Sequence, residues 1–196
     1  WWVSRPPGGR DRREALADER PVRGGRLVSS IRAEPRSFNR LVSRDLVTEV
    51  VTLLTQGRLV RINRATQQIE PWLAEQWTAS ADGRVFTLAL RPGLRWSDGE
   101  PFSAADVAFT FRAIADPTVK SVLGSALQVE GQPIRVDTPD SSTVVVTLPR
   151  PFGPGIRLLD NIPILPRHRL EPALTAGTLA QAWSATTAPA ELVGMG

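Results

Sequence analysis

Three carboxylates and one histidine are the side chains of this sequence with the clearest capacity for chemistry. Asp98, Glu100 and Asp106 lie close together, and clustered carboxylate oxygens are the ligands that Ca²⁺ prefers. Their spacing does not match a calcium loop, so we interpret Asp98 as a turn residue, Glu100 as exposed, and Asp106 as favoured by a helix dipole. His168 is the only histidine, there is no cysteine, and the nearby serines lack a nucleophile-elbow pattern. We therefore expect no metal site, no cofactor and no enzymatic centre.

The elements around these carboxylates can be predicted from residues 73–106. Apolar residues alternate over residues 85–90, which predicts a strand with one buried face. Asp82-Gly83 before it supplies the positive φ angles of a two-residue hairpin loop. Ser103 with an acidic residue three positions later is a helix N-cap pattern, which predicts a helix over residues 104–115.

A second helix is predicted upstream, from a cap at Ser43 to about Gln56. Gly57 occupies the position of a left-handed C-cap. The residues expected on one side of this helix are apolar: Leu46, Val50, Leu53 and Leu54.

The remaining segments are short. We expect strands over residues 26–31, 126–130, 134–137 and 143–148, and a short helix over residues 178–183. The prolines between residues 149 and 172 exclude one long helix there.

Composition excludes several classes of protein. Of 196 residues, 41% are hydrophobic, which is enough for a buried core, but no apolar run approaches the ~20 residues of a membrane span. The net charge is +4, and Lys120 is the only lysine. The arginines are spread along the chain among acidic residues and form no basic stripe, so we expect no nucleic-acid partner.

The motifs within residues 73–107 resemble the signature of the family 5 extracellular solute-binding proteins. They read, in order, Leu-Ala-Glu-x-Trp, Asp-Gly, Phe-Thr-Leu, Leu-Arg-Pro-Gly-Leu-Arg-Trp-Ser-Asp-Gly and Ala-x-Asp-Val. The match is dense over residues 26–117, weaker to Gly196 and absent from residues 1–25. Members of this family are the receptors of ATP-driven peptide, opine and nickel importers.

The resemblance implies a mixed α/β fold of the periplasmic-binding-protein type II. The chain would form part of lobe I with its β-rich subdomain, and the fold would be incomplete. Residues 1–25 are expected to be a flexible leader, and residues 26–196 the N-terminal part of a solute-binding lobe. Within that part, residues 26–57 would hold the first strand, cleft loop and helix, residues 58–165 the β-rich subdomain, and residues 166–196 the return to lobe I.

The function implied is that of the substrate-binding component of an ABC importer, not an enzyme. It would capture oligopeptides or a similar small solute outside the cytoplasm and deliver it to the membrane subunits of an ABC permease. The expected location is periplasmic or membrane-anchored and extracytoplasmic, with a signal or lipoprotein segment that is not in this sequence, and the expected state is a monomer. A solute-sensing domain of the same fold without a transport role stays open as an alternative.

A ligand site follows from the resemblance together with backbone chemistry. A receptor for varied peptides must bind the main chain, and an extended segment with free N–H and C=O groups can do so as an added strand. Residues 34–39 are the segment with this character, in the position of the family's S-F-N-P loop, with Arg40 in place of the proline. We predict that the cleft is lined by Glu34, Arg36, Ser37, Phe38 and Asn39.

Overall fold

The computed structural model describes residues 28 and 30–195. The chain divides into two units, Trp1–Arg32 and Ala33–Gly196, and the architecture below is that of the second unit. The predicted leader lies outside the described residues. Of the strand predicted over residues 26–31, Val28, Ser30 and Ile31 are described and are not in a strand, so the prediction is wrong at these positions. Ile31 is largely exposed and pairs with no strand in the described part of the chain.

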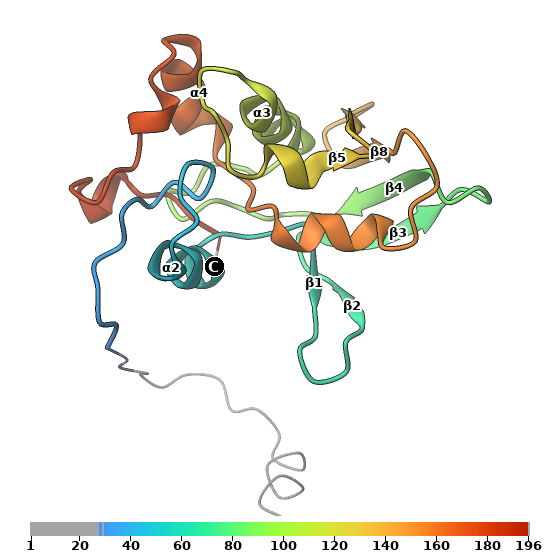
Figure 1. Ribbon diagram of the computed structural model, residues 1–196, viewed down its shortest axis with the longest axis horizontal. Coiled ribbons are helices and arrows are strands. Elements are labelled where there is room, and N and C mark those ends of the chain that lie inside the picture. The colour runs from blue at the N-terminus through green and yellow to red at the C-terminus, as the bar shows by residue number, and fades with distance from the viewer. Residues whose placement is uncertain (1–27, 29, 196) are drawn as a thin grey trace, which may run out of the picture. The chain divides into compact units, whose positions relative to one another are not determined.

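A four-stranded antiparallel sheet forms the centre of this unit (Figure 1). Its order is β3 (Ala74–Ala79), β4 (Val85–Leu90), β8 (Thr143–Thr147) and β7 (Arg135–Asp137). One face of β4 is buried, as the alternation predicts: Phe86, Leu88 and Leu90. The strands predicted over residues 134–137 and 143–148 are confirmed as an antiparallel pair, β7 with β8.

The turn between β3 and β4 is longer than the predicted two-residue loop. The Ser80 N–H donates to the Val85 carbonyl (2.8 Å), so residues 81–84 form the loop. Only Gly83 has a positive φ, +67°, and its N–H donates to the Ser80 carbonyl. The Asp82 carboxylate accepts from the Ser80 hydroxyl and the Arg84 N–H, which stabilises the wider turn.

Helix α3 (Ala104–Ala115) has the predicted bounds. Ser103 is its N-cap, and the Ser103 N–H donates to Oδ2 of Asp106 (2.9 Å). The other oxygen of this buried carboxylate accepts from the Arg167 N–H at 2.9 Å, where α4 (Arg167–Thr175) begins. Asp106 therefore fixes two helix starts, and α3 and α4 lie side by side (Figure 1).

Helix α2 (Leu46–Thr55) begins later than predicted, because Asp45 is the N-cap and Ser43 donates to the Asp45 carboxylate. The predicted left-handed C-cap at Gly57 is wrong. The helix ends in an extended Gln56, and Gly57 has no positive φ. A Cβ at Gly57 would lie 2.9 Å from a methyl group of Leu73, so glycine is needed here for close packing.

The remaining elements are short. None of the helices in the described part of the chain is both long and apolar enough to cross a membrane. The predicted strand over residues 126–130 is reduced to β5 (Gln128–Val129), because a 3₁₀ turn occupies its first half. The short helix predicted over residues 178–183 is only one 3₁₀ turn. In chain order these short elements are β1 (Val60–Ile62), β2 (Ile69–Pro71), η1 (Gly124–Leu127), β5 (Gln128–Val129), β6 (Gln132–Pro133), η2 (Gly155–Asn161), η3 (Leu179–Gln181) and η4 (Pro189–Glu191).

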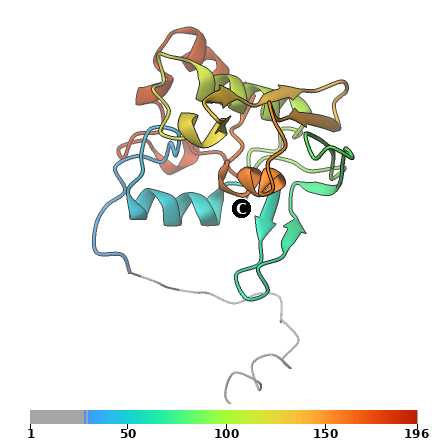
Figure 2. The same ribbon diagram turned by 45° about the vertical axis from the view of Figure 1, so that its right-hand side comes forward.

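The β1–β2 hairpin projects from the rest of this unit in both ribbon views (Figures 1 and 2). Strand β1 contacts η2, and the Ile62 N–H donates to the Asp160 carboxylate at 2.9 Å. These contacts connect the hairpin to η2, the segment that follows the sheet.

Candidate ligand-binding site

The predicted ligand segment, residues 34–39, runs as irregular chain towards α2. Glu34 and Arg36 are exposed, Phe38 is half-buried, and Ser37 and Asn39 are buried. The structure therefore places only some of the five predicted residues where a solute could contact their side chains.

The backbone of residues 37–39 is already hydrogen-bonded. The Phe38 N–H donates to the Trp183 carbonyl (2.7 Å), and the Phe38 carbonyl accepts from Nε2 of Gln56 (3.2 Å). The Ser37 carbonyl accepts from the Thr48 hydroxyl (2.8 Å). The expectation of free N–H and C=O groups is therefore wrong for these positions, because buried backbone groups must find partners within the protein.

Asn39 and Ser37 use their side chains in the same way. Nδ2 of Asn39 donates to the Leu179 carbonyl (2.9 Å), and its Oδ1 accepts from the Leu41 N–H (3.1 Å). The Ser37 hydroxyl donates to the Trp183 carbonyl (3.0 Å). Both side chains therefore hold the segment against η3 and against Trp183, which follows it.

Two hollows flank the segment. The first has a volume of about 550 Å³ and is lined mainly by polar residues: Arg36, Ser37, Val42, Ser43, Arg44, Asp45, Ala180, Gln181 and Ser184. The second, of about 490 Å³, is mostly apolar: Phe38, Val51, Leu54, Thr55, Gln56, Ser97, Trp183, Pro189, Leu192, Val193 and Gly194. Glu34 lines neither of them.

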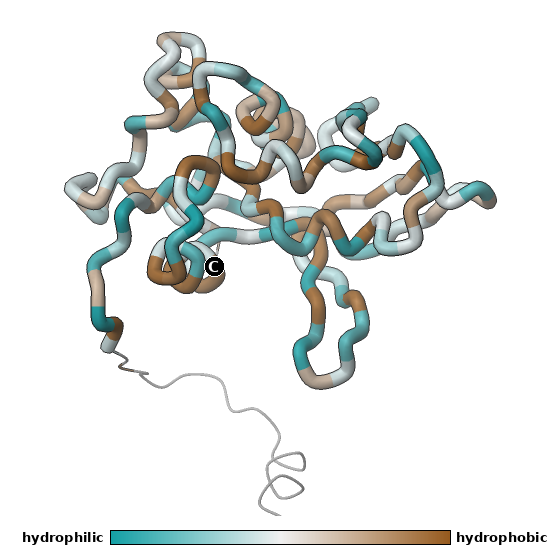
Figure 3. The backbone as a smooth tube through the Cα atoms, in the orientation of Figure 1, coloured by the Kyte–Doolittle hydropathy of each residue, from teal (hydrophilic) through white to brown (hydrophobic). Residues whose placement is uncertain are grey.

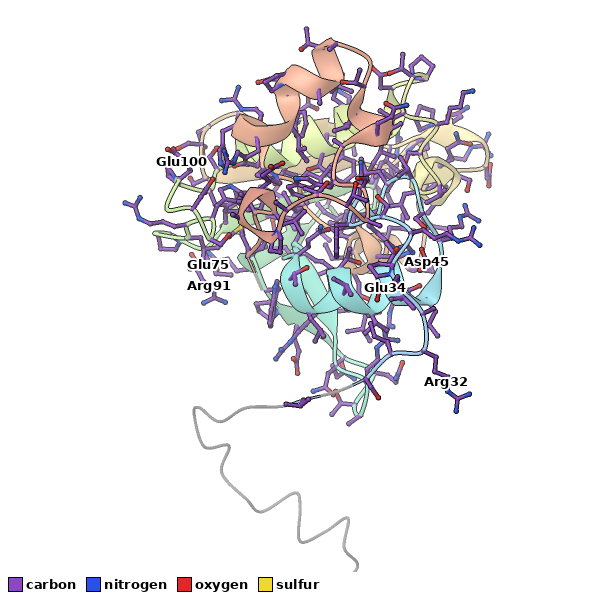
Figure 4. All side chains as sticks on the ribbon, turned by 90° about the vertical axis from the view of Figure 1, so that its left-hand side faces the viewer. Arg32, Glu34, Asp45, Glu75, Arg91 and Glu100 are labelled. Carbon is purple, nitrogen blue, oxygen red and sulfur yellow. The ribbon has the colours of Figure 1, made fainter. Side chains whose placement is uncertain are left out.

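Of the charged residues that line the polar hollow, two have hydrogen-bond partners and one, Arg36, has none within residues 30–195. Asp45 lies at the start of α2 (Figure 4) and accepts hydrogen bonds from the Thr48 N–H and the Ser43 hydroxyl. The single Thr48 hydroxyl proton is shared between Oδ2 of Asp45 (2.6 Å) and the Ser37 carbonyl (2.8 Å). Burial opposes ionisation, but these hydrogen bonds outweigh it and hold the pKa of the Asp45 carboxyl well below its usual value. Arg44 donates to the Val122 carbonyl. Arg36 has no hydrogen-bond or ion-pair partner within residues 30–195, so its guanidinium can receive a carboxylate.

Of the other candidate residues, Asp98 and His168 contact each other, whereas Glu100 is exposed. Nε2 of His168 lies 2.8 Å from Oδ2 of Asp98, and Nε of Arg169 lies 3.3 Å from the same oxygen. Burial disfavours the ionised form of Asp98, but the hydrogen bond from His168 outweighs it and lowers the pKa of the Asp98 carboxyl. Glu100 is exposed, on the opposite side of the view from Asp45 (Figure 4). In the described part of the chain, no three His, Asp or Glu side chains gather as a metal site.

Sequence reasoning missed three residues around the segment. Thr48 lies on the buried face of α2, Gln56 is the buried C-cap of that helix, and Trp183 contacts the segment from a distant part of the chain. The spacing of Thr48, Thr52 and Gln56, four residues apart, is the signal that could have identified a polar buried face of α2. No local pattern connects Trp183 to Phe38.

The comparisons with known proteins agree with this architecture. Residues 68–196 match the family described as bacterial extracellular solute-binding proteins, family 5 Middle. A probable ABC transporter-binding protein of Deinococcus radiodurans is 28% identical over all of this chain and 32% of its own length. The dipeptide-binding protein of Escherichia coli is 29% identical over 80% of this chain and 32% of its own length. The chain thus spans about a third of the length of these relatives.

Solved structures give the same result. OppA from Haemophilus influenzae, in complex with the peptide RPPGFSPFR, aligns with a TM-score of 0.70 and 25% identity over 83% of this chain and 33% of that protein. NikZ from Campylobacter jejuni, in complex with Ni(L-His), aligns with a TM-score of 0.64 and 29% identity over 84% of this chain and 30% of that protein. The predicted mixed α/β fold, type II and partial, is confirmed. The chain belongs to family 5 of the bacterial extracellular solute-binding proteins.

Proposed function

We propose that this chain is part of the substrate-binding component of an ABC importer and that its ligands are oligopeptides or similar small solutes. The family match carries this proposal, since family 5 consists of extracellular solute-binding proteins. Relatives named for dipeptide, D,D-dipeptide and nickel binding support the class of function. A longer polypeptide with a second lobe would complete the receptor, because the relatives are about three times as long.

Residues 34–39 are the proposed ligand segment on this lobe, with roles divided by exposure. Glu34 and Arg36 are the charged groups available to a solute, and Arg36 opens into the polar hollow. A guanidinium is suited to a carboxylate such as the terminus of a peptide. Phe38 contributes an apolar wall, while Ser37 and Asn39 keep the segment in shape through their buried hydrogen bonds.

The proposed partners and location follow from the same assignment. The receptor would work as a monomer outside the cytoplasm, in the periplasm or attached to the membrane, and deliver its solute to the membrane subunits of an ABC permease. The proposed function requires neither a nucleic-acid partner nor a cofactor.

Calorimetry on two proteins tests the proposal. The 196-residue chain should bind the peptide RPPGFSPFR weakly, because only one side of the cleft is present. The longer receptor encoded by the reading frame that contains this chain should bind it with water largely excluded. In that receptor Arg36→Ala should weaken binding about tenfold, whereas Arg135→Ala, which removes an exposed arginine on β7, should not. Equal affinities for these two variants would refute the assignment of Arg36.

A further inference from the structure

Trp183 has a backbone conformation that L-residues disfavour. Its φ is +55°, and four non-glycine residues of the described part share this property: Gln67, Lys120, Glu130 and Trp183. The other three are exposed turn residues, whereas Trp183 is buried with 6% of its surface exposed. A bulky residue is held in this region only when the surrounding structure compensates for the strain, and such residues often serve function.

This conformation directs the Trp183 carbonyl at the proposed ligand segment. The carbonyl accepts the Phe38 N–H at 2.7 Å and the Ser37 hydroxyl at 3.0 Å. The next residue, Ser184, forms an antiparallel bridge with Ser37. The Leu179 carbonyl, four residues earlier, accepts from the Asn39 side chain. One short segment therefore holds three consecutive residues that lie about 140 positions earlier in the chain.

We propose that Trp183 is a positioning residue for ligand binding, acting through Ser37 and Phe38. The buried indole anchors the segment that follows η3, and the left-handed backbone turns the carbonyl towards Phe38. The indole and the Phe38 ring line the same apolar hollow, so a change at Trp183 also moves that wall. This inference rests on the proposed function of residues 34–39.

The backbone effect can be separated from the loss of the indole. Trp183→Asn and Trp183→Val both remove the indole, but asparagine tolerates a positive φ and a β-branched valine resists it. Gln67→Val places the same strain in an exposed turn of the β1–β2 hairpin, away from Phe38, and controls for a general loss of stability.

Two measurements read out the position of the segment. Hydrogen exchange of the Phe38 amide, followed by NMR on the 196-residue chain, should be about tenfold faster in Trp183→Val than in Trp183→Asn. Affinity of the longer receptor for RPPGFSPFR should fall by a similar factor between the same two variants. Gln67→Val should change neither quantity.

Several results would contradict the positioning role of Trp183. Equal exchange at Phe38 in the two Trp183 variants overturns the positioning role, and so does different exchange with equal affinity. A wild-type receptor that binds no peptide refutes the proposed function, while the exchange comparison still decides whether Trp183 holds Phe38. If Trp183→Val does not fold, Ser37→Ala removes one of the two hydrogen bonds to the carbonyl, and unchanged Phe38 exchange in that variant counts against the proposal.

Discussion

Helices α2 and α3 both carry an apolar stripe, but only α3 buries it. In α3, Val107, Phe111 and Ile114 are buried against the sheet and α4. In α2, Leu46 and Leu54 are 74% and 73% exposed. Figure 3 shows the hydrophobic stretches of α2 in brown on the helix labelled in Figure 1.

The buried side of α2 is instead polar. Thr48, Thr52 and Gln56 face the protein, and two of them hydrogen-bond to carbonyls of the proposed ligand segment. Sequence periodicity therefore identifies an apolar stripe but not the surface against which it packs. The apolar stripe of α3 packs against the sheet and α4, whereas α2 packs through its polar side against the proposed ligand segment.

Among substitutions that bury no charge, Phe109→Ala should have the largest effect on stability. Phe109 is 1% exposed, and replacing a buried phenylalanine by alanine costs about 3–5 kcal/mol of unfolding free energy. Urea unfolding of the variant measures this loss. A loss below about 1 kcal/mol would show that α3 is not packed as described.

The same contrast explains how much could be predicted from the sequence. Elements with local signals were predicted well: the α3 bounds follow from the Ser103 cap, and the buried face of β4 follows from alternation. The wider β3–β4 turn and the close packing at Gly57 depend on Asp82 and Leu73, whose contacts the pattern of turn residues does not reveal. The family, and the position of the ligand segment within it, came from resemblance.

The candidate site was less predictable than the fold. Exposure of Glu34 and Arg36 agrees with a ligand role, which stays a prediction. The free backbone expected at Ser37 and Phe38 is absent, because their partners Thr48 and Trp183 come from a helix face and a distant segment. Long-range partners of this kind have no signature in a single sequence.

Thr48→Val should have the second-largest effect and tests the polar face of α2. The substitution keeps the size of the side chain but leaves the buried Ser37 carbonyl without its donor, which costs about 1–3 kcal/mol. Thr55→Val, on the exposed side of the same helix, is the matched control and should change stability by less than about 0.5 kcal/mol. Equal unfolding free energies for the two variants, measured in urea, would refute the assigned orientation of α2.

Asp45→Ala should cost about 1 kcal/mol near neutral pH through loss of the α2 cap. Because hydrogen bonds lower the pKa of Asp45 in the folded state, its contribution is present above the unfolded value of about 4 and is lost as the pH falls towards the folded pKa. The stability difference between wild type and variant should therefore be constant from pH 7 to about 5 and shrink below about pH 4.

Ser103→Ala at the α3 cap removes no ionisable group, so its effect should not shrink in this way. A constant difference for Asp45→Ala down to pH 3 would show that the carboxylate is not stabilised in the folded state.

Leu54→Glu should have the smallest effect and tests directly whether the apolar stripe of α2 is unburied. Because Leu54 is 73% exposed, a charge at this position loses little buried contact, and the unfolding free energy of the 196-residue chain should change by less than about 0.5 kcal/mol. The same substitution type at a buried position of α3, Ile114→Glu, should prevent folding or cost several kcal/mol, because an unpaired charge would be buried.

Urea unfolding at several protein concentrations, with sedimentation in parallel, separates stability from association. A loss above about 1 kcal/mol for Leu54→Glu that is independent of concentration would show that the stripe of α2 packs within the chain. A loss that grows with concentration would show that the stripe joins two copies, contrary to the predicted monomer.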